Sequence, residues 1–257
     1  DKMVADGKTP WAIGVESGAA SGWAGTDWIE DIMLRTAEPD IYDLWVSHGI
    51  SWLDEHVQKA FETFGQIVLN EEYVYGGTNA ALTINFGNSP DALFTTPPNA
   101  YMHRQATFIK SFILDHFPDL VPGEDLDFFP FPPIDPQYGN PALGAASVFV
   151  MFNDTPEARA FMQFIYSKEP QEIMASELGF LAVNKWVSPD SYPDDLTRKA
   201  AKILNDASTV RFDGSDLMPA AVGSGSFWTG ILDYISGTSL KNVLMTLETS
   251  ALDAYRK

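Results

Sequence analysis

The chain has 257 residues, of which 45% are hydrophobic and 13% aromatic, enough for a packed core in one large domain or two smaller ones. Its 35 acidic and 16 basic residues give a formal net charge of −19, and the acidic residues are scattered along the chain. Such a surface repels phosphate backbones and anionic lipids, so we expect no nucleic-acid partner and no membrane-surface binding. Neutral ligands are the class of partner that this charge affects least.

The chain contains no cysteine, which excludes disulfides, thiolate metal sites and cysteine nucleophiles. Its longest apolar run, 148–152, is the length of a strand and far shorter than the roughly 18–20 residues that span a bilayer.

In the first half of the chain, residues 10–15 are expected to form a strand that runs into a loop of small residues, 17–25. Asp27 is expected to begin a helix, because Glu30 follows three residues later as in a capping box. Helical spacing or short runs of apolar residues predict the next elements: a helix at about 54–69, short strands at 82–84 and 92–94, and a helix at about 100–114.

In the second half, the proline-rich and aromatic stretch 128–136 is expected to be an extended crossover. The continuous apolar run 147–152 predicts a buried strand, and Thr155 followed by Pro156 predicts the start of a helix. That helix is expected to face the core with Ala160, Phe161, Phe164 and Ile165. Further helices are predicted at about 170–177, 195–206, 226–236 and 240–250, with Gly179 and Gly237 as C-terminal caps. Strands that alternate with helices indicate an α/β fold.

Sequence patterns for common enzyme chemistry are missing. The four histidines form no HExxH motif, and the chain contains no GxSxG, so neither zinc-dependent hydrolysis nor a serine nucleophile elbow has support. The sequence GSGS at 223–226 is not followed by GK[ST], and we interpret it as a turn before a helix. We expect no metal and no cofactor.

One carboxylate and several aromatic residues point to a ligand site. Glu16 follows the first predicted strand and faces a loop of small residues, where ligand sites of α/β folds lie. Asp213 or Asp216 could pair with Glu16 as the carboxylates of a glycosidase, although both are also typical turn residues. Trp23 and Trp228 have glycine-rich neighbours that leave an indole face accessible, and aromatic faces with a few carboxylates suit a neutral sugar.

Several motifs together resemble one protein family, the α-glucoside branch of the family 1 extracellular solute-binding proteins of ABC importers, which are similar to maltose-binding protein. The similarity runs in order over essentially the whole chain. The motifs are TPW at 9–11, ESGAA at 16–20, TDWIED at 26–31, FTTPP at 94–98, YMHRQA at 101–106, RFDGSDLMP at 211–219 and GSGSFW at 223–228.

The resemblance implies the type II periplasmic-binding-protein fold, in which two α/β lobes joined by a hinge close on a sugar and the closed form docks on a membrane permease. It implies an extracytoplasmic protein without enzymatic activity. By this comparison, residues 1–142 belong to the C-terminal lobe, 143–190 to the N-terminal lobe, and 191–257 return to the C-terminal lobe.

The residues expected to face the ligand follow from the resemblance, position by position. Asp213 lies in a matching motif that could contact the ligand or brace a loop. In GAAS, 144–147, the chain departs from an expected glycine-rich turn that ends in aspartate, which leaves the identity of the sugar open. The complete set of expected ligand-binding residues is Glu16, Ser17, Trp23, Tyr101, His103, Asp213 and Trp228.

A second departure concerns the start of the chain. Family members carry a long segment before the position that matches Asp1, and it builds most of the N-terminal lobe. We therefore expect a processed or truncated chain, in which 143–190 lacks its sheet partners unless a companion chain supplies them. Apolar surface should then be exposed around Val148, Val150 and Phe152.

The favoured hypothesis is thus a binding protein for a neutral sugar. The alternatives are a glycoside hydrolase that uses Glu16 with Asp213 or Asp216, and an acidic interaction module released by proteolysis.

Overall fold

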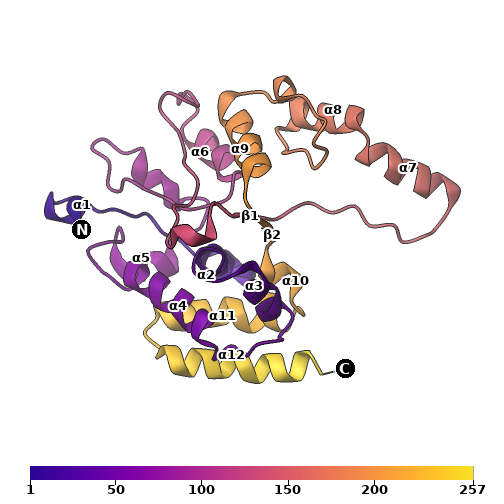
Figure 1. The fold of residues 1–257 in the computed structure, drawn as a ribbon. Coiled ribbons are helices and arrows are strands. Elements are labelled where there is room, and N and C mark those ends of the chain that lie inside the picture. The colour runs from indigo at the N-terminus through magenta and orange to yellow at the C-terminus, as the bar shows by residue number, and fades with distance from the viewer. Residues whose placement is uncertain (257) are drawn as a thin grey trace.

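The computed structural model describes residues 1–256, and most of the regular structure is helical (Figure 1). Two short parallel strands, β1 (Ala142–Gly144) and β2 (Val210–Phe212), form a sheet. A π-helical segment, Val222–Phe227, leads directly into α11. The α-helices of the described residues are α1 (Lys2–Ala5), α2 (Trp23–Met33), α3 (Pro39–Val46), α4 (Glu55–Val68), α5 (Gly77–Thr83), α6 (Ile109–His116), α7 (Pro156–Tyr166), α8 (Lys168–Leu178), α9 (Asp195–Asp206), α10 (Gly214–Leu217), α11 (Trp228–Ile235) and α12 (Leu240–Ala254).

Helix α2 lies at the centre of the main core; α4 and α11 pack against it, and α12 packs on α4 and α11 (Figure 1). Every residue of α2 from Ala24 to Met33 is buried, as expected of a helix surrounded by protein on all sides. Aromatic rings fill much of this core in edge-to-face pairs, each worth about 0.5–1.5 kcal/mol beyond its buried area. Trp52 lies 4.9 Å from Phe227 and 5.2 Å from Trp45 between ring centroids.

Helices whose start is marked by a local cap are found where the sequence predicts them. Asp54 caps α4 by accepting a hydrogen bond from His56 N at 2.9 Å, and Thr155 caps α7 through Ala158 N at 3.1 Å. Helix α9 has its predicted bounds, and α8 ends at Gly179 in a left-handed conformation. The crossover predicted at 128–136 has no regular element over 128–135, and its last residue begins a short 3₁₀ helix, Pro136–Tyr138.

The prediction that Asp27 begins a helix is wrong. Helix α2 begins four residues earlier, at Trp23, after Gly22 with a φ of 105°. The two residues of the supposed capping box lie inside the helix, because their carboxylates bind other parts of the fold. Asp27 accepts from Arg104, and Glu30 accepts from the backbone of Ser215.

The predicted strand at 10–15 is an extended segment held by isolated bridges instead of a sheet. Trp11 bridges to Val74 and to Met102. The pairing with Met102 also explains why the helix predicted at 100–114 begins only at Ile109: Ala12 N donates to Met102 O at 2.9 Å, which keeps that segment extended.

Three other predicted strands are also wrong. Residues 82–84 lie at the end of α5, and 92–94 end a short 3₁₀ helix, Ser89–Leu93. Short apolar runs do not distinguish a strand from a turn of helix, and these were such runs. The stretch 147–152 forms no strand and is not buried, because no neighbouring strand lies beside it in residues 1–256.

The chain between β1 and β2 extends away from the main core. Figure 1 shows it leaving β1 as a long extended segment that reaches α7. Val148, Val150 and Phe152 are 72%, 63% and 92% exposed, which confirms the expected bare apolar surface. The predicted inner face of α7 is exposed as well at Phe161 and Phe164.

A second, small core lies in the chain between β1 and β2, and residues of both α8 and α9 belong to it. It consists of Ala175, Val187, Tyr192 and Ala201. The predicted segment boundary at 190 runs through this core, so residues on both sides of that boundary pack together here. None of the helices in 1–256 combines the length and apolar content that crossing a bilayer requires.

Gly22 brings the start of α2 into contact with the start of α11. A Cβ at this position would lie 2.3 Å from the carbonyl oxygen of Trp228. Gly18 also has a positive φ, 56°, but a Cβ there would meet no atom within 4 Å.

We therefore predict that Gly22→Ala destabilises the protein more than Gly18→Ala does. Left-handed backbone alone should cost Gly18→Ala roughly 1 kcal/mol, and the steric overlap with a backbone atom should at least double that cost in Gly22→Ala. Urea unfolding gives both free energies. If both variants lose the same free energy of unfolding, the backbone at Trp228 can move to accommodate the added Cβ and the prediction is wrong.

Candidate functional site

Glu16 ends the extended segment, and its backbone is fixed on both sides. Its N–H donates to Ile84 O at 3.3 Å, and its carbonyl accepts from Phe86 N at 3.0 Å. The segment 84–86 therefore lies against Glu16, although about seventy residues separate them in sequence.

Two hydrogen bonds orient the carboxylate of Glu16. Oε2 accepts from the amide of Asn85 at 2.8 Å, and Oε1 accepts from Gly18 N at 2.6 Å. Both bonds favour the ionised form and lower the pKa of Glu16, the bond from Asn85 most strongly. Since an ionised carboxylate has about four lone-pair sites, Glu16 keeps capacity to accept bonds from a ligand.

The loop that follows Glu16 is closed by its own side chains. Ser17 N donates to Ser21 Oγ at 2.8 Å, and Ser21 Oγ donates to Gly18 O at 2.8 Å. The loop therefore holds Ser17, half-buried, directly beside Glu16.

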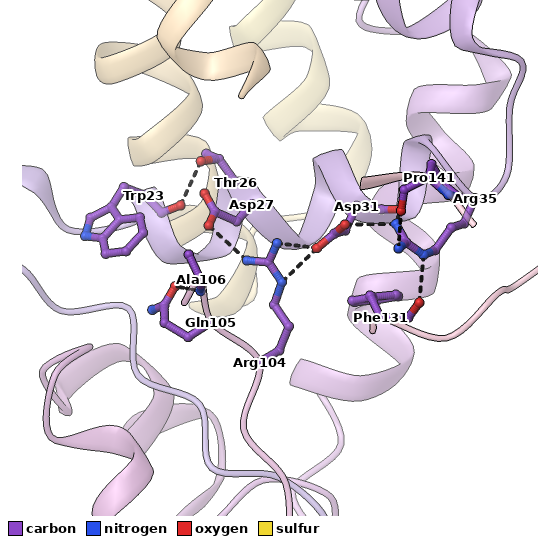
Figure 2. A network of polar contacts seen from close by, with 10 residues as sticks. All are labelled: Trp23, Thr26, Asp27, Asp31, Arg35, Arg104, Gln105, Ala106, Phe131 and Pro141. Carbon is purple, nitrogen blue, oxygen red and sulfur yellow. Dashed lines mark hydrogen bonds and ion pairs between the residues drawn. The ribbon is translucent and has the colours of Figure 1, made fainter. Parts of the chain in front are cut away.

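Trp23 opens α2 and belongs to an aromatic group beside Glu16; Figure 2 shows its ring at this end of the helix. Its ring centroid lies 5.2 Å from that of Phe86 and 5.9 Å from that of Phe108. Phe108 is 41% exposed, so this group presents an apolar face to solvent. We call Trp23, Phe86 and Phe108 the aromatic platform.

Sequence reasoning missed Asn85, Phe86 and Phe108. Asn85 directly follows the apolar run 82–84, and a polar residue after such a run was the one available signal. Phe108 lies in a segment predicted to be helical, where an aromatic residue indicates packing rather than exposure.

Trp228 lies at the junction of the π-helical segment and α11, next to Gly22 and so near the start of α2. Its indole Nε1 and the hydroxyl of Ser226 are both buried and have no hydrogen-bond partner within the described residues. Buried polar atoms without partners are uncommon in native structures. This junction thus contains two buried polar atoms without a hydrogen-bond partner, within three residues of one another.

Tyr101 and His103 are positioned by the bridge to the extended segment. Tyr101 is 38% exposed, with Lys8 Nζ 5.0 Å from its ring centroid. Nδ1 of His103 lies 2.9 Å from Ala12 O and therefore carries the proton, and its Nε2 is buried without a partner among residues 1–256. Burial lowers the pKa of His103 to about 4, so the ring is neutral at physiological pH.

Asp213 braces a loop. It is 9% exposed, and its Oδ1 accepts from Ser215 Oγ at 2.8 Å and from Asp216 N at 3.1 Å, which caps α10. Of the two roles left open for Asp213, the structure supports bracing. Asp216 is exposed at the next turn.

Ion pairs fasten α2 to the segments around it (Figure 2). Arg104 donates to Asp27 at 2.9 Å and to Asp31 at 3.0 Å. Arg35 donates to Asp31 Oδ1 at 2.8 Å and to Pro141 O at 2.9 Å. These bonds join the segment that pairs with Trp11 and Ala12, the central helix and the crossover before β1.

Two hollows on the surface lie away from the seven predicted residues. A hollow of about 190 Å³ lies beside the 3₁₀ helix Ser89–Leu93, and another of about 400 Å³ lies on α4. Neither has any of the seven in its wall, within the part of the chain that the structure describes. Glu16 is connected to Trp23 through Phe86, which donates to the carbonyl of Glu16 and packs on the Trp23 ring. Trp228 lies next to Gly22, the residue before Trp23.

Comparison with known proteins gives relatives along nearly the whole chain. It is 49% identical over 249 residues to the osmoprotective compounds-binding protein GgtB of Synechocystis sp., covering 97% of this chain and 58% of that protein. It is 44% identical over 246 residues to the alpha-glucosides-binding periplasmic protein AglE of Rhizobium meliloti, covering 95% of this chain and 53% of that protein. The chain is homologous to solute-binding proteins.

The fold agrees with that of solved solute-binding proteins. A chitin oligosaccharide binding protein superimposes with a TM-score of 0.75 at 20% identity, covering 98% of this chain and 62% of that one. The predicted periplasmic-binding-protein fold and the predicted family resemblance are thus confirmed. No family model matches the chain. The chain spans little more than half the length of the solute-binding proteins it matches.

The buried neutral histidine gives a testable pH dependence. An unfolded chain protonates His103 near its usual pKa of about 6.5, whereas the folded protein does so only near 4. Protons therefore favour unfolding between these values, and stability is lost as the pH falls, by up to about 3 kcal/mol.

We predict that His103→Asn, which keeps a donor near Ala12 O, loses less stability between pH 6.5 and 4.5 than the wild type. Urea unfolding across this range measures the slope. Gln66→Asn, at an exposed residue of α4 that does not titrate, is the control and should follow the wild type. A His103→Asn slope equal to that of the wild type would contradict the prediction.

Proposed function

We propose that this chain is the sugar-recognising part of the substrate-binding component of an ABC importer. It would act outside the cytoplasm, bind a neutral sugar of the α-glucoside class, and deliver it to a membrane permease without chemical change. Support comes from the names of the two relatives, which are binding proteins, and from the geometry around Glu16.

The observation that carries the proposal is an ionised, oriented carboxylate beside an aromatic platform. Glu16 is held by Asn85 and Gly18, and Phe86, the neighbour of Asn85, belongs to the platform with Trp23 and Phe108. A sugar presents hydroxyls at its rim and apolar C–H groups on its faces. A fixed acceptor beside an aromatic face matches both features.

The remaining predicted residues take supporting roles in this proposal. Ser17 offers a hydroxyl next to Glu16, Tyr101 and Trp228 offer aromatic faces, and His103 holds the extended segment in register. Asp213 braces the loop before α10 and is not proposed to touch the sugar. Because the relatives are almost twice as long, ligand contacts are also expected from the rest of the protein.

The hydrolase alternative has no support from the comparisons. Asp213 is committed to capping α10, and the relatives are binding proteins. Incubation with α-glucosides should release no glucose, and release at a steady rate would revive this alternative.

We predict that Glu16→Gln weakens the binding of an α-glucoside about tenfold. The charge-assisted hydrogen bonds that a carboxylate accepts are roughly twice as strong as neutral ones, and about 1.4 kcal/mol corresponds to tenfold in affinity. Isothermal titration calorimetry of the full-length protein with maltose, sucrose and trehalose tests this. Glu177→Gln, at an exposed residue of α8, makes the same charge change and should bind as the wild type does. Equal affinity in Glu16→Gln would remove Glu16 from the site.

We predict that Trp228→Ala lowers the affinity for the same sugars by about 1–3 kcal/mol, the range for loss of one aromatic stacking surface. Trp186→Ala, at an indole that is 71% exposed, removes the same side chain elsewhere and should leave affinity unchanged. Circular dichroism confirms that both variants fold. A folded Trp228→Ala protein with wild-type affinity would exclude stacking on Trp228.

A further inference from the structure

Three carboxylates from two distant parts of the chain meet inside the core. Asp27 and Glu30 come from α2, and Asp213 comes from the residue before α10. One oxygen of each lies within 4.8 Å of the others. Their exposures are 6%, 0% and 9%, so water screens none of them effectively. This carboxylate cluster is separate from the proposed sugar site.

The cluster contains an oxygen that nothing in residues 1–256 satisfies. Glu30 Oε1 accepts from Ser215 N at 3.0 Å, whereas Oε2 is fully buried and has no hydrogen-bond partner. Asp213 Oδ1 and Asp27 Oδ2 have donors of their own. Oε2 of Glu30 is therefore a hydrogen-bond acceptor without a donor, and its neighbours in the cluster are carboxylate oxygens, which are also acceptors.

Formal charge also fails to balance here. If all were ionised, the three carboxylates and the adjacent Asp31 would carry four negative charges, and the cations that bind this group are Arg104 and Arg35. Two negative charges would then have no partner, and burial raises the pKa of Glu30 well above its usual range when no cation is present. The nearby hydroxyls do not donate to the free oxygen of Glu30, because Tyr42 donates to Phe212 O and Ser215 donates to Asp213. Buried charge without compensation is strongly unfavourable.

We propose that a divalent cation of the calcium class binds between Asp27, Glu30 and Asp213. Its charge equals the deficit, and carboxylate oxygen is the ligand that Ca²⁺ prefers. Oxygens held about 2.3–2.6 Å from Ca²⁺ are at most about 5 Å apart across the ion, which is compatible with the spacing of the cluster. The free oxygen of Glu30 would be one of the ligands.

The bound cation would tie α2 to α10, which precedes the π-helical segment. Ser215, in α10, touches this segment closely: a Cβ on Gly223 would lie 1.9 Å from Ser215 O. The cation would thus stabilise the connection from the core to Trp228 without itself contacting a sugar.

The test is thermal unfolding of the wild-type protein at pH 7.5 after treatment with EDTA, with CaCl₂ or MgCl₂ added back. We expect millimolar Ca²⁺ to raise Tm by several degrees, since a ligand that binds only the folded state stabilises it. Calorimetric titration with Ca²⁺ and metal analysis of protein dialysed against trace Ca²⁺ should both show one ion per chain.

Glu30→Gln should remove the Ca²⁺-dependent rise in Tm and weaken Ca²⁺ binding at least tenfold. Asp43→Asn, at an exposed carboxylate paired with Arg211, makes an equal charge change and should keep the response. Wild-type protein that shows neither a Ca²⁺-dependent Tm nor heat of binding would overturn the proposal and assign two protons to the cluster instead. That result stands even if Glu30→Gln does not fold, and it leaves sugar binding untouched.

Discussion

The charge of Arg104, with its side chain 12% exposed, is held between two carboxylates of α2, and the placement of the other segments depends on this arrangement. Loss of one partner of a buried ion pair costs about 3–5 kcal/mol, because the other charge then remains buried alone. Arg104 directly follows the residues that pair with the extended segment. Its ion pairs therefore fix α2 relative to that segment, and with it the position of Glu16 relative to Trp23.

Elements whose ends depend on local chemistry were predictable from the sequence. Asp54 and Thr155 cap the helices that follow them, and α9 begins after Asp194, another local cap. The start of α2 was not predictable, because Asp27 and Glu30 form a locally plausible cap while their carboxylates bind Arg104 and Ser215, more than seventy residues away. The spacing of residues in the sequence does not indicate hydrogen-bond partners this far apart along the chain.

In the candidate site, too, some features follow from local sequence and others depend on residues far along the chain. Glu16 could be proposed from its place after an extended run beside small residues. Asn85, which orients its carboxylate, comes from another part of the chain through a single backbone bridge, and only the folded structure shows that contact. Asp213 carried two interpretations that the sequence could not distinguish, and the hydrogen bonds that it accepts from Ser215 and Asp216 are those of a residue that braces a loop. Position along the chain thus indicates which side chains to consider for a ligand site, and the contacts in the folded structure show how each of them is held.

The exposed apolar segment at 148–152 has a consequence for how the protein behaves in solution. Two copies that meet through this segment could bury apolar area, yet each carries a formal charge of −19. Repulsion between like charges acts over roughly a Debye length, about 30 Å at 0.01 M salt but only about 3 Å at 1 M. Dilute buffer therefore keeps the copies apart, and concentrated salt removes the barrier. We therefore expect ionic strength to control whether copies of this chain associate through residues 148–152.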